Sequence, residues 1–394
     1  MEATEPACTS KAEDLFPFER ARKGQDQFLE EARNCFASRT HLLAHAPTGM
    51  GKTAVSLASG LECSLAQKGF LFFLTAKQSQ HAAAIECLRQ IWRRRKLAAV
   101  DIVARESMCL AQRRGGRSPC LEGTPCYFRN SRVEAAAERL LDYPLHVQEA
   151  VGLCLRMGAC PYLASLKALR MADVAVCDFN QVFTMEEGLL GRTGNEASST
   201  CLVVDEAHNL TTRIMDNHSA ELDERRIAQA STDPRLRRLK GDIEAVREVF
   251  RAVSKPNPRK NVDPWELEER LAELCGTGSS GLAKELTDAM GEDARGGVQD
   301  LARFLALWSA FGKGSARFVR GTPPALHCRL LDPSLVGAPV LERVRCALLM
   351  SGTLHPPEMF AEMLGIQERS ACRRYPSPFP VENRMVLAVP GVSS

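Results

Sequence analysis

The sequence lacks a strong net charge, a long apolar run and many aromatic residues. Its 394 residues carry a formal charge of +3, and only 6% of them are aromatic. The longest strongly apolar run, residues 70–76, is far too short to span a bilayer, so no membrane association is expected. Near the N-terminus no basic flank precedes an apolar segment, and the sequence therefore predicts a cytoplasmic protein without a secretory signal. The composition is that of a globular protein.

The fifteen cysteines cannot all pair with one another, because their number is odd. A chain of this length buries enough apolar surface to fold without disulfides or a structural metal. In a reducing cytosol, clustered cysteines bind metal or act in catalysis more often than they form disulfides. Cys63, Cys87, Cys177, Cys201 and Cys346 lie in apolar contexts and are interpreted as core residues. Five other cysteines are isolated, and the remaining five gather in one basic stretch.

Six apolar runs of strand length recur along the chain, with helical stretches between them. They are residues 41–46, 70–76, 98–104, 173–179, 201–207 and 346–352. Continuous apolar runs are typical of strands buried on both faces, which favours an α/β fold with a parallel sheet covered by helices. A cysteine-rich basic stretch interrupts this rhythm at about residues 105–160, and a charged, helical one interrupts it at about 218–325. Because a further strand follows the helical stretch, we interpret that stretch as an insertion in the sheet domain.

Two motifs follow strands and indicate nucleotide chemistry. In the first, glycines let backbone amides close around phosphates, Lys52 neutralises the outer phosphates and the Thr53 hydroxyl binds Mg²⁺. The predicted nucleotide-binding residues of this loop are Ala46, Pro47, Thr48, Gly49, Met50, Gly51, Lys52 and Thr53. In the second, the sequence Asp-Glu-Ala-His, Asp205 holds Mg²⁺ through water and Glu206 orients or deprotonates the attacking water. Together the two motifs predict a nucleotide hydrolase.

The motifs resemble those of the XPD/DinG-type DNA helicases of superfamily 2, and most closely the XPD branch. The matching segments are HAPTGMGKT, DEAH, LTAKQSQH, LMSGTL, FERARKGQ and CDFNQVF, in family order over nearly the whole chain. The resemblance implies a RecA-like P-loop motor domain with a parallel sheet, interrupted by an iron-sulfur cluster domain and a helical arch. The expected segments are 1–104, 161–217 and 331–366 for the motor domain, 105–160 for the cluster domain, 218–330 for the arch, and 367–394 for the start of a second motor domain.

The resemblance also implies roles for single residues. Arg22 and Gln25 would contact adenine. Lys52, Asp205, Glu206 and His208 would be catalytic, with His208 linking hydrolysis to DNA binding. Thr75, Gln80 and Asn180 would lie near the DNA strand, and Ser351 and Thr353 would couple it to the state of the nucleotide. The resemblance further implies an ATP-dependent motor that moves 5′ to 3′ on single-stranded DNA, with a role in DNA repair; no residue encodes the direction or the pathway.

The cysteines of the first interruption lack the two close pairs of a zinc ribbon. An iron-sulfur cluster needs four thiolates from irregular backbone, which this stretch can supply. XPD-like helicases have such a cluster, whose last ligand lies in a Cys-Pro-Tyr segment. The resemblance therefore implies a 4Fe-4S cluster on Cys109, Cys120, Cys126 and Cys160. Cys154 lies on an expected helix and is left out, and zinc on the same ligands or no metal remain alternatives.

The small net charge hides an uneven distribution. Between residues 86 and 132, eleven basic residues face four acidic ones, a local excess of seven positive charges. Such patches bind phosphate backbones, and Tyr127 and Phe128 beside Arg129 offer a stacking surface for bases. Arg105 joins this set of predicted DNA-binding residues. Taken alone, a run such as residues 93–96 is more often a solvated helix end, but a cluster and a motor nearby favour single-stranded or fork DNA as the partner.

The resemblance implies a second RecA-like domain whose arginines complete the ATP site, and the residues after 366 are too few to form one. The sequence therefore predicts a C-terminally truncated helicase, monomeric and associated with a prokaryotic nucleoid, that binds DNA but hydrolyses ATP poorly alone. An alternative is an iron-sulfur module that is not a motor. It would bind single-stranded DNA or act as a regulatory protein, and its nucleotide site would be vestigial. A nuclease is a third hypothesis, although no extra carboxylate cluster supports it.

Overall fold

A seven-stranded parallel sheet forms the centre of the chain, whose computed structural model describes residues 15–22, 24–113, 126–185, 188–254, 261–290, 297–383 and 385. The strand order is β10-β1-β9-β5-β2-β4-β3. The strands are β1 (His41–His45), β2 (Phe70–Thr75), β3 (Ala99–Asp101), β4 (Val174–Asp178), β5 (Thr200–Asp205), β9 (Cys346–Ser351) and β10 (Ser370–Arg374). Six of them fall in or overlap the six predicted apolar runs, so the predicted α/β fold is confirmed.

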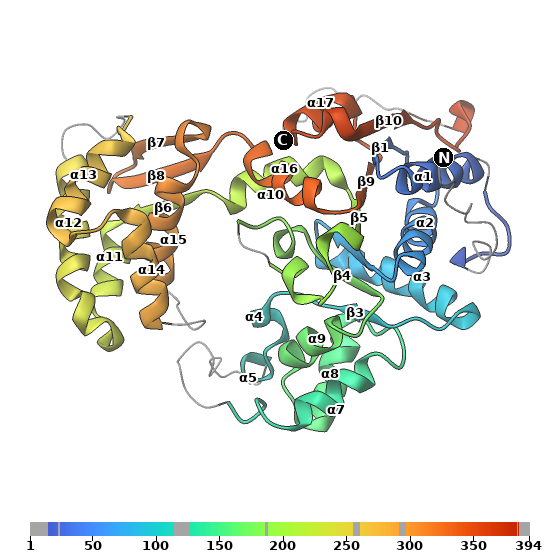
Figure 1. Cartoon of the computed structure of the whole chain (residues 1–394), viewed down its shortest axis with the longest axis horizontal. Helices are drawn as coiled ribbons and strands as arrows, with labels where there is room; N and C mark the ends of the chain where they lie inside the picture. The colour runs from blue at the N-terminus through green and yellow to red at the C-terminus, as the bar shows by residue number, and fades with distance from the viewer. Residues whose placement is uncertain are drawn as a thin grey trace, which may run out of the picture.

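Helices cover both faces of this sheet (Figure 1). On one face lie α1 (Gln25–Ala37), α2 (Lys52–Ala66) and α3 (His81–Arg94); on the other lie α9 (Pro161–Leu169), α10 (Leu210–Asn217), α16 (Ser334–Arg343) and α17 (Pro357–Met363). Side chains of β2 alternate between the two cores, with Leu71 and Phe73 on the first face and Phe72 and Leu74 on the second. Burial on both faces explains why the strand sequences are apolar throughout.

The cysteine-rich insertion is helical and connects β3 to β4, its neighbour in the sheet. Its helices are α4 (Arg105–Met108), α5 (Leu110–Arg113), α7 (Arg132–Leu140) and α8 (Val147–Met157), and α9 follows them. The start of α8 is fixed by a capping box, in which the Glu149 carboxylate accepts from the His146 backbone N–H at 2.7 Å. This insertion therefore packs beneath the strand edge that carries β3 and β4 (Figure 1).

The second insertion has its own core around the fully buried Trp308. Its helices are α11 (Glu224–Ser231), α12 (Lys240–Ser254), α13 (Pro264–Cys275), α14 (Ser279–Met290) and α15 (Gly297–Ala310). They pack against a three-stranded antiparallel sheet of β6 (Ala220–Asp223), β8 (Ala325–Leu330) and β7 (Ser315–Arg320), which the sequence had not predicted. The chain enters through β6 and leaves through β8, and the Leu330 backbone N–H donates to Ser219 Oγ at 3.1 Å.

The edge strand β10 extends the first sheet beyond the boundary expected at residue 366. Ser370 to Arg374 pair in parallel with His41 to His45 of β1. Residues 370–374 were expected to belong to the start of a second motor domain, and they instead complete the sheet of the first. None of the described helices combines the length and the apolarity that crossing a bilayer requires.

Candidate nucleotide and nucleic-acid site

The predicted phosphate loop connects β1 to α2 at the carboxyl edge of the sheet. Gly49 and Gly51 have φ angles of 87° and 76°, in the left-handed region that favours glycine. Arg22 Nη1 donates to the Gly49 carbonyl at 3.2 Å, and Gln25 Oε1 accepts from the Arg22 backbone N–H at 2.5 Å. A Cβ atom at Gly51 would lie 1.9 Å from Gln25 Nε2. The two predicted adenine contacts therefore lie directly against the phosphate loop.

The other loop residues support this cradle. Ala46 and Met50 are buried, and the Met50 backbone N–H donates to the Pro47 carbonyl at 3.4 Å, closing the turn around Thr48. Lys52 is the first residue of α2, so it lies at the positive end of the helix dipole. Thr53 follows in the first turn. This arrangement is suited to binding an anion.

Asp205 and Glu206 lie at the carboxyl end of β5, at the same edge of the sheet as the loop. Burial, and then the charge of Glu206, raise the pKa of Asp205 to about 6, while the Lys52 charge opposes the shift. Two carboxylates facing one lysine leave the site short of positive charge, which a divalent cation would supply. Glu206 has a φ of 52°, which is rare outside glycine and marks backbone strain at this position.

Ser351 connects the two motifs, because β9 lies between β1 and β5. Its carbonyl accepts from the Ala46 backbone N–H at 3.0 Å. Its hydroxyl donates to Glu206 Oε2 at 2.9 Å and lies 2.8 Å from His208 Nδ1. Since the single hydroxyl hydrogen points to Glu206, His208 Nδ1 must carry the proton of the second contact. Thr353 donates its backbone N–H to the same hydroxyl oxygen at 3.1 Å.

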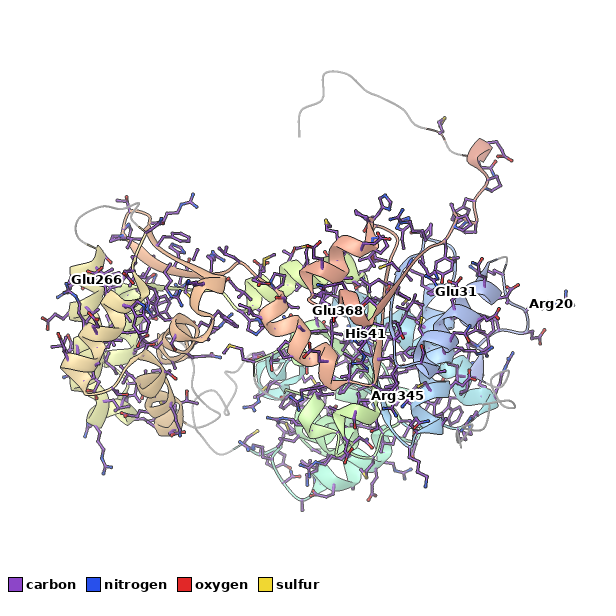
Figure 2. All side chains as sticks on the ribbon, turned by 45° about the horizontal axis from the view of Figure 1, so that its top comes forward. Arg20, Glu31, His41, Glu266, Arg345 and Glu368 are labelled. Carbon is purple, nitrogen blue, oxygen red and sulfur yellow. The ribbon has the colours of Figure 1, made fainter. Side chains whose placement is uncertain are left out.

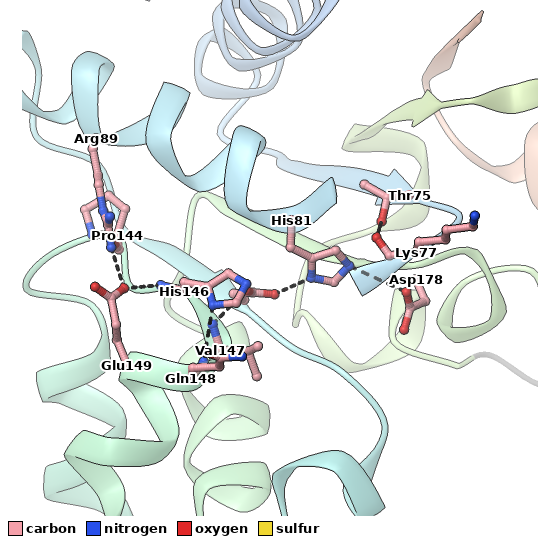
Figure 3. A network of polar contacts seen from close by, with 11 residues as sticks. Thr75, Lys77, His81, Arg89, Pro144, His146, Val147, Gln148, Glu149 and Asp178 are labelled. Atoms are coloured by element: carbon pink, nitrogen blue, oxygen red, sulfur yellow. Dashed lines mark hydrogen bonds and ion pairs between the residues drawn. The ribbon is translucent and has the colours of Figure 1, made fainter. Parts of the chain in front are cut away.

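A buried charge network joins the parallel-sheet domain to the cysteine-rich insertion (Figure 3). His81, the first residue of α3, has its Nδ1 2.6 Å from Asp101 Oδ1 and its Nε2 3.5 Å from Asp178 Oδ1. The other Asp101 oxygen accepts from the Val147 backbone N–H at the start of α8, at 2.8 Å. Burial alone lowers the pKa of His81, but the hydrogen bonds and charges of the two aspartates outweigh it and raise the pKa to about 9. His81 and Asp178 lie in the segments LTAKQSQH and CDFNQVF, but nothing in the sequence indicated that the two would contact each other beside Asp101.

Three of the residues predicted to lie near DNA, Thr75, Gln80 and Asn180, lie at or just after the carboxyl ends of β2 and β4. Thr75 ends β2 and is buried, and its hydroxyl donates to the Lys77 carbonyl at 3.1 Å. Gln80 Oε1 accepts from the Lys77 backbone N–H at 3.2 Å, so both side chains shape this loop. Asn180 follows β4 and accepts a hydrogen bond from Asn217 of α10. A nucleic-acid role for the three residues stays a prediction.

Three of the four predicted cluster ligands line one pocket. Cys109, Cys126 and Cys160 surround it, together with Arg105 and Arg129. Cys160 precedes the proline that begins α9. The fourth predicted ligand, at position 120, lies outside the described residues.

Aromatic residues close this pocket. The Cys160 backbone N–H donates to the Phe128 carbonyl at 2.7 Å, which docks the segment 126–129 onto the start of α9. The Arg105 guanidinium lies 5.1 Å from the centre of the Tyr162 ring. Tyr127, by contrast, is 73% exposed and its ring is available to a ligand. The two arginines in the otherwise largely apolar lining are compatible with an anionic thiolate cluster.

Cys154 does not line this pocket. It is buried on α8, and burial, with the nearby Cys160, raises the pKa of its thiol to about 12. Within the part of the chain that the structure describes, Cys109, Cys126 and Cys160 form no group close enough for a single ion. Zinc on the four predicted ligands, the alternative that the sequence had left open, stays untested because position 120 lies outside the described residues.

Some arginines of the basic stretch make structural contacts within the protein. Arg89 donates to the Pro144 carbonyl at 3.0 Å and pairs with Glu149, and Arg94 donates to the Phe16 carbonyl at 2.9 Å. These arginines anchor neighbouring segments to α3. The local excess of positive charge therefore overstates the surface available to phosphates.

A cleft of about 850 Å³ lies where the second insertion meets the motor domain. Arg192 lines it from the motor side and Arg303 of α15 from the other, with Asn217 between them. Arg303 Nη2 donates to the Asn217 carbonyl at 2.6 Å. The cleft is thus basic and adjoins Asn180, which contacts the same Asn217.

Comparison with known proteins gives consistent matches. The DEAD_2 family matches residues 74–227. A protein of Methanocaldococcus jannaschii described as a probable ATP-dependent helicase is 22% identical over 204 residues, 51% of this chain and 30% of the relative. The ATP-dependent DNA helicase CHL1 of Candida glabrata is 19% identical over 283 residues, 62% of this chain and 34% of the relative. The chain thus spans about a third of the length of these curated relatives.

Solved structures share the fold. An XPD helicase aligns with a TM-score of 0.61 and 20% identity, over 91% of this chain and 63% of that one. A truncated XPD aligns with a TM-score of 0.56 and 21% identity, over 89% of this chain and 99% of that one. The chain thus contains a DEAD_2 region, is similar in sequence to ATP-dependent helicases over part of their length, and shares its fold with XPD structures.

Proposed function

We propose that the chain provides the first motor domain of an ATP-dependent DNA helicase, in which ATP hydrolysis drives movement along single-stranded or fork DNA. The observation that carries this proposal is the convergence of three motifs at one edge of the sheet, where Ser351 contacts both Ala46 and Glu206. Movement from 5′ to 3′ and a role in DNA repair are supported by the resemblance alone.

The phosphate loop would bind ATP through its backbone amides and Lys52, with Arg22 and Gln25 at the adenine. Thr53 and Asp205 would hold Mg²⁺, which supplies charge neutralisation at the transferred phosphate. Glu206, held by Ser351, would orient the attacking water. The same hydroxyl also contacts His208. A movement of the Glu206 carboxylate would therefore displace the hydroxyl and change its contact with the His208 imidazole, and the reverse also holds. This shared hydroxyl is the proposed coupling between the nucleotide and the DNA strand.

The strand itself would follow the basic cleft between α10 and α15, past Asn180, and reach the exposed Tyr127 of the cysteine-rich insertion. We propose a 4Fe-4S cluster on Cys109, Cys120, Cys126 and Cys160, which holds that insertion in shape. Since the described residues form one RecA-like domain, we also propose that a second such domain must supply arginines for fast hydrolysis. The chain alone should therefore bind Mg-ATP more readily than it hydrolyses it.

The test is binding of a fluorescent ATP analogue, measured with and without Mg²⁺, followed by DNA-stimulated hydrolysis. Lys52→Ala should weaken nucleotide binding at least about tenfold, because a charge-assisted contact to phosphate is lost. Lys68→Ala, which removes a lysine from the turn after α2, is the matched control. Equal nucleotide affinity of wild type and Lys52→Ala would refute the proposed site, whatever the rate of hydrolysis.

A further inference from the structure

Three cysteines that are far apart in the sequence meet at the edge of the sheet opposite the nucleotide site. Cys63 lies near the end of α2, and Cys201 and Cys346 are register partners at the amino ends of β5 and β9. All three sulfur atoms lie within 4.8 Å of one another. Asp205 is four residues further along β5, so the cluster is about 13 Å from the nucleotide edge.

The sulfur spacing matches that around a metal ion. An ion bonded to three sulfurs at ~2.3 Å separates them by about 4.0 Å in a planar arrangement and about 3.8 Å in a tetrahedral one. The sulfur atoms of Cys201 and Cys346 are 3.8 Å apart. A disulfide would need the two atoms to approach to about 2.05 Å. An ion therefore fits this cluster with less displacement than a disulfide does.

A buried arginine lies next to the cluster in the sequence. Arg345 precedes Cys346, is 9% exposed, and its Nε is buried without a hydrogen-bond partner. It lies in the motor body, away from the second insertion that carries Glu266 (Figure 2). Cys63 is partly exposed, which gives solvent ions a route to the site.

The donor set selects the class of ion. Among the residues that the structure describes, no fourth cysteine, histidine or carboxylate joins the group. His41 begins the neighbouring strand β1, but its Nδ1 accepts from the Ala347 backbone N–H, and Ala347 packs in the core on the other face of the sheet. Three thiolates without a nitrogen or oxygen ligand suit soft ions.

We propose that Cys63, Cys201 and Cys346 form a binding site for one soft metal ion of the Cu(I) class. The ion would bind α2, β5 and β9 together at one edge of the sheet. These are the three elements that carry Lys52, Asp205 and Ser351 near the opposite edge. The site would thus hold the nucleotide-binding scaffold in register without taking part in its chemistry.

The test uses Cd²⁺ as a probe, because it binds thiolates without changing oxidation state. Anaerobically purified full-length chain is dialysed against Cd²⁺, and bound cadmium, iron and sulfur-to-metal absorption are measured. Cys63→Ser and Cys346→Ala should each bind about one cadmium ion fewer per chain than wild type, with iron content unchanged. Cys87→Ala and Cys177→Ala, which remove buried thiols elsewhere, are the matched controls and should bind as wild type does.

A second measurement needs no variant. On wild-type protein, Cd²⁺ should slow alkylation of Cys63 at least about tenfold, as read by mass spectrometry of its peptide, because a bound thiolate is not a free nucleophile. Equal cadmium content in the cysteine variants and wild type would overturn the proposal. So would unprotected Cys63, or a disulfide between any two of the three cysteines in protein purified without oxidant.

Discussion

The buried His81 network allows a quantitative prediction about stability and pH. The aspartates raise the pKa of His81 from 6.5 to about 9, and its side chain is fully buried. At about 1.4 kcal/mol per pKa unit, this shift corresponds to about 3 kcal/mol of unfolding free energy. His81→Gln keeps a hydrogen-bond donor but removes the charge. The variant should therefore unfold at a thermal midpoint several degrees lower than wild type.

The sign of the pH dependence follows from the direction of the shift. Because the pKa is higher in the folded state, the contribution is complete below pH 6.5 and disappears as the pH rises through about 9. Thermal or urea unfolding of both proteins across this range measures it. His146→Gln is the control, since His146 Nε2 lies 3.9 Å from Asp101 and its side chain is 20% exposed. A difference between wild type and His81→Gln that does not change with pH would refute a charged His81.

Four further predictions concern other sites. Tyr127→Ala should weaken binding to single-stranded DNA by about 1–3 kcal/mol in fluorescence anisotropy, because one stacked base is lost. Ser351→Ala should keep Mg-ATP binding but reduce DNA stimulation of hydrolysis, and unchanged stimulation would argue against the shared hydroxyl as the coupling. Cys160→Ala should lower iron per chain, whereas Cys154→Ala should keep iron and lower only the thermal midpoint; equal iron loss would contradict the assigned ligands. Burial, and then a nearby arginine, lower the pKa of His41 to about 4, so wild type should lose about 3 kcal/mol of stability as the pH falls from 6.5 towards 4; His41→Asn should flatten that loss in urea unfolding.

The central strands could be predicted from the sequence because burial on both faces makes them apolar throughout. β10 could not, since its sequence SACRR lacks a continuous apolar run and is partly or fully exposed at the sheet edge. The three strands of the second insertion were also missed. In β7 and β8, buried and exposed residues alternate between charged helices, and such a pattern is weaker than a continuous apolar run.

Local motifs indicated the nucleotide site because each lies within a few residues of one strand end. The contacts between motifs were not readable in the same way. Cys201 and Cys346 are 145 residues apart and meet only because β9 inserts beside β5. His81 and Asp101 are 20 residues apart and meet through the turn of α3 back to β3. Such pairs depend on strand order, which spacing in one sequence does not encode.

The paired strands β6 and β8 make the second insertion a removable cassette. Its two ends are joined by the hydrogen bond between Leu330 and Ser219, so a short glycine-rich linker could connect these two positions if residues 220–329 were deleted. The motor sheet would keep its strand order in such a deletion. Related insertions of different size could then be exchanged at this neck while the strand order of the parallel sheet stays the same.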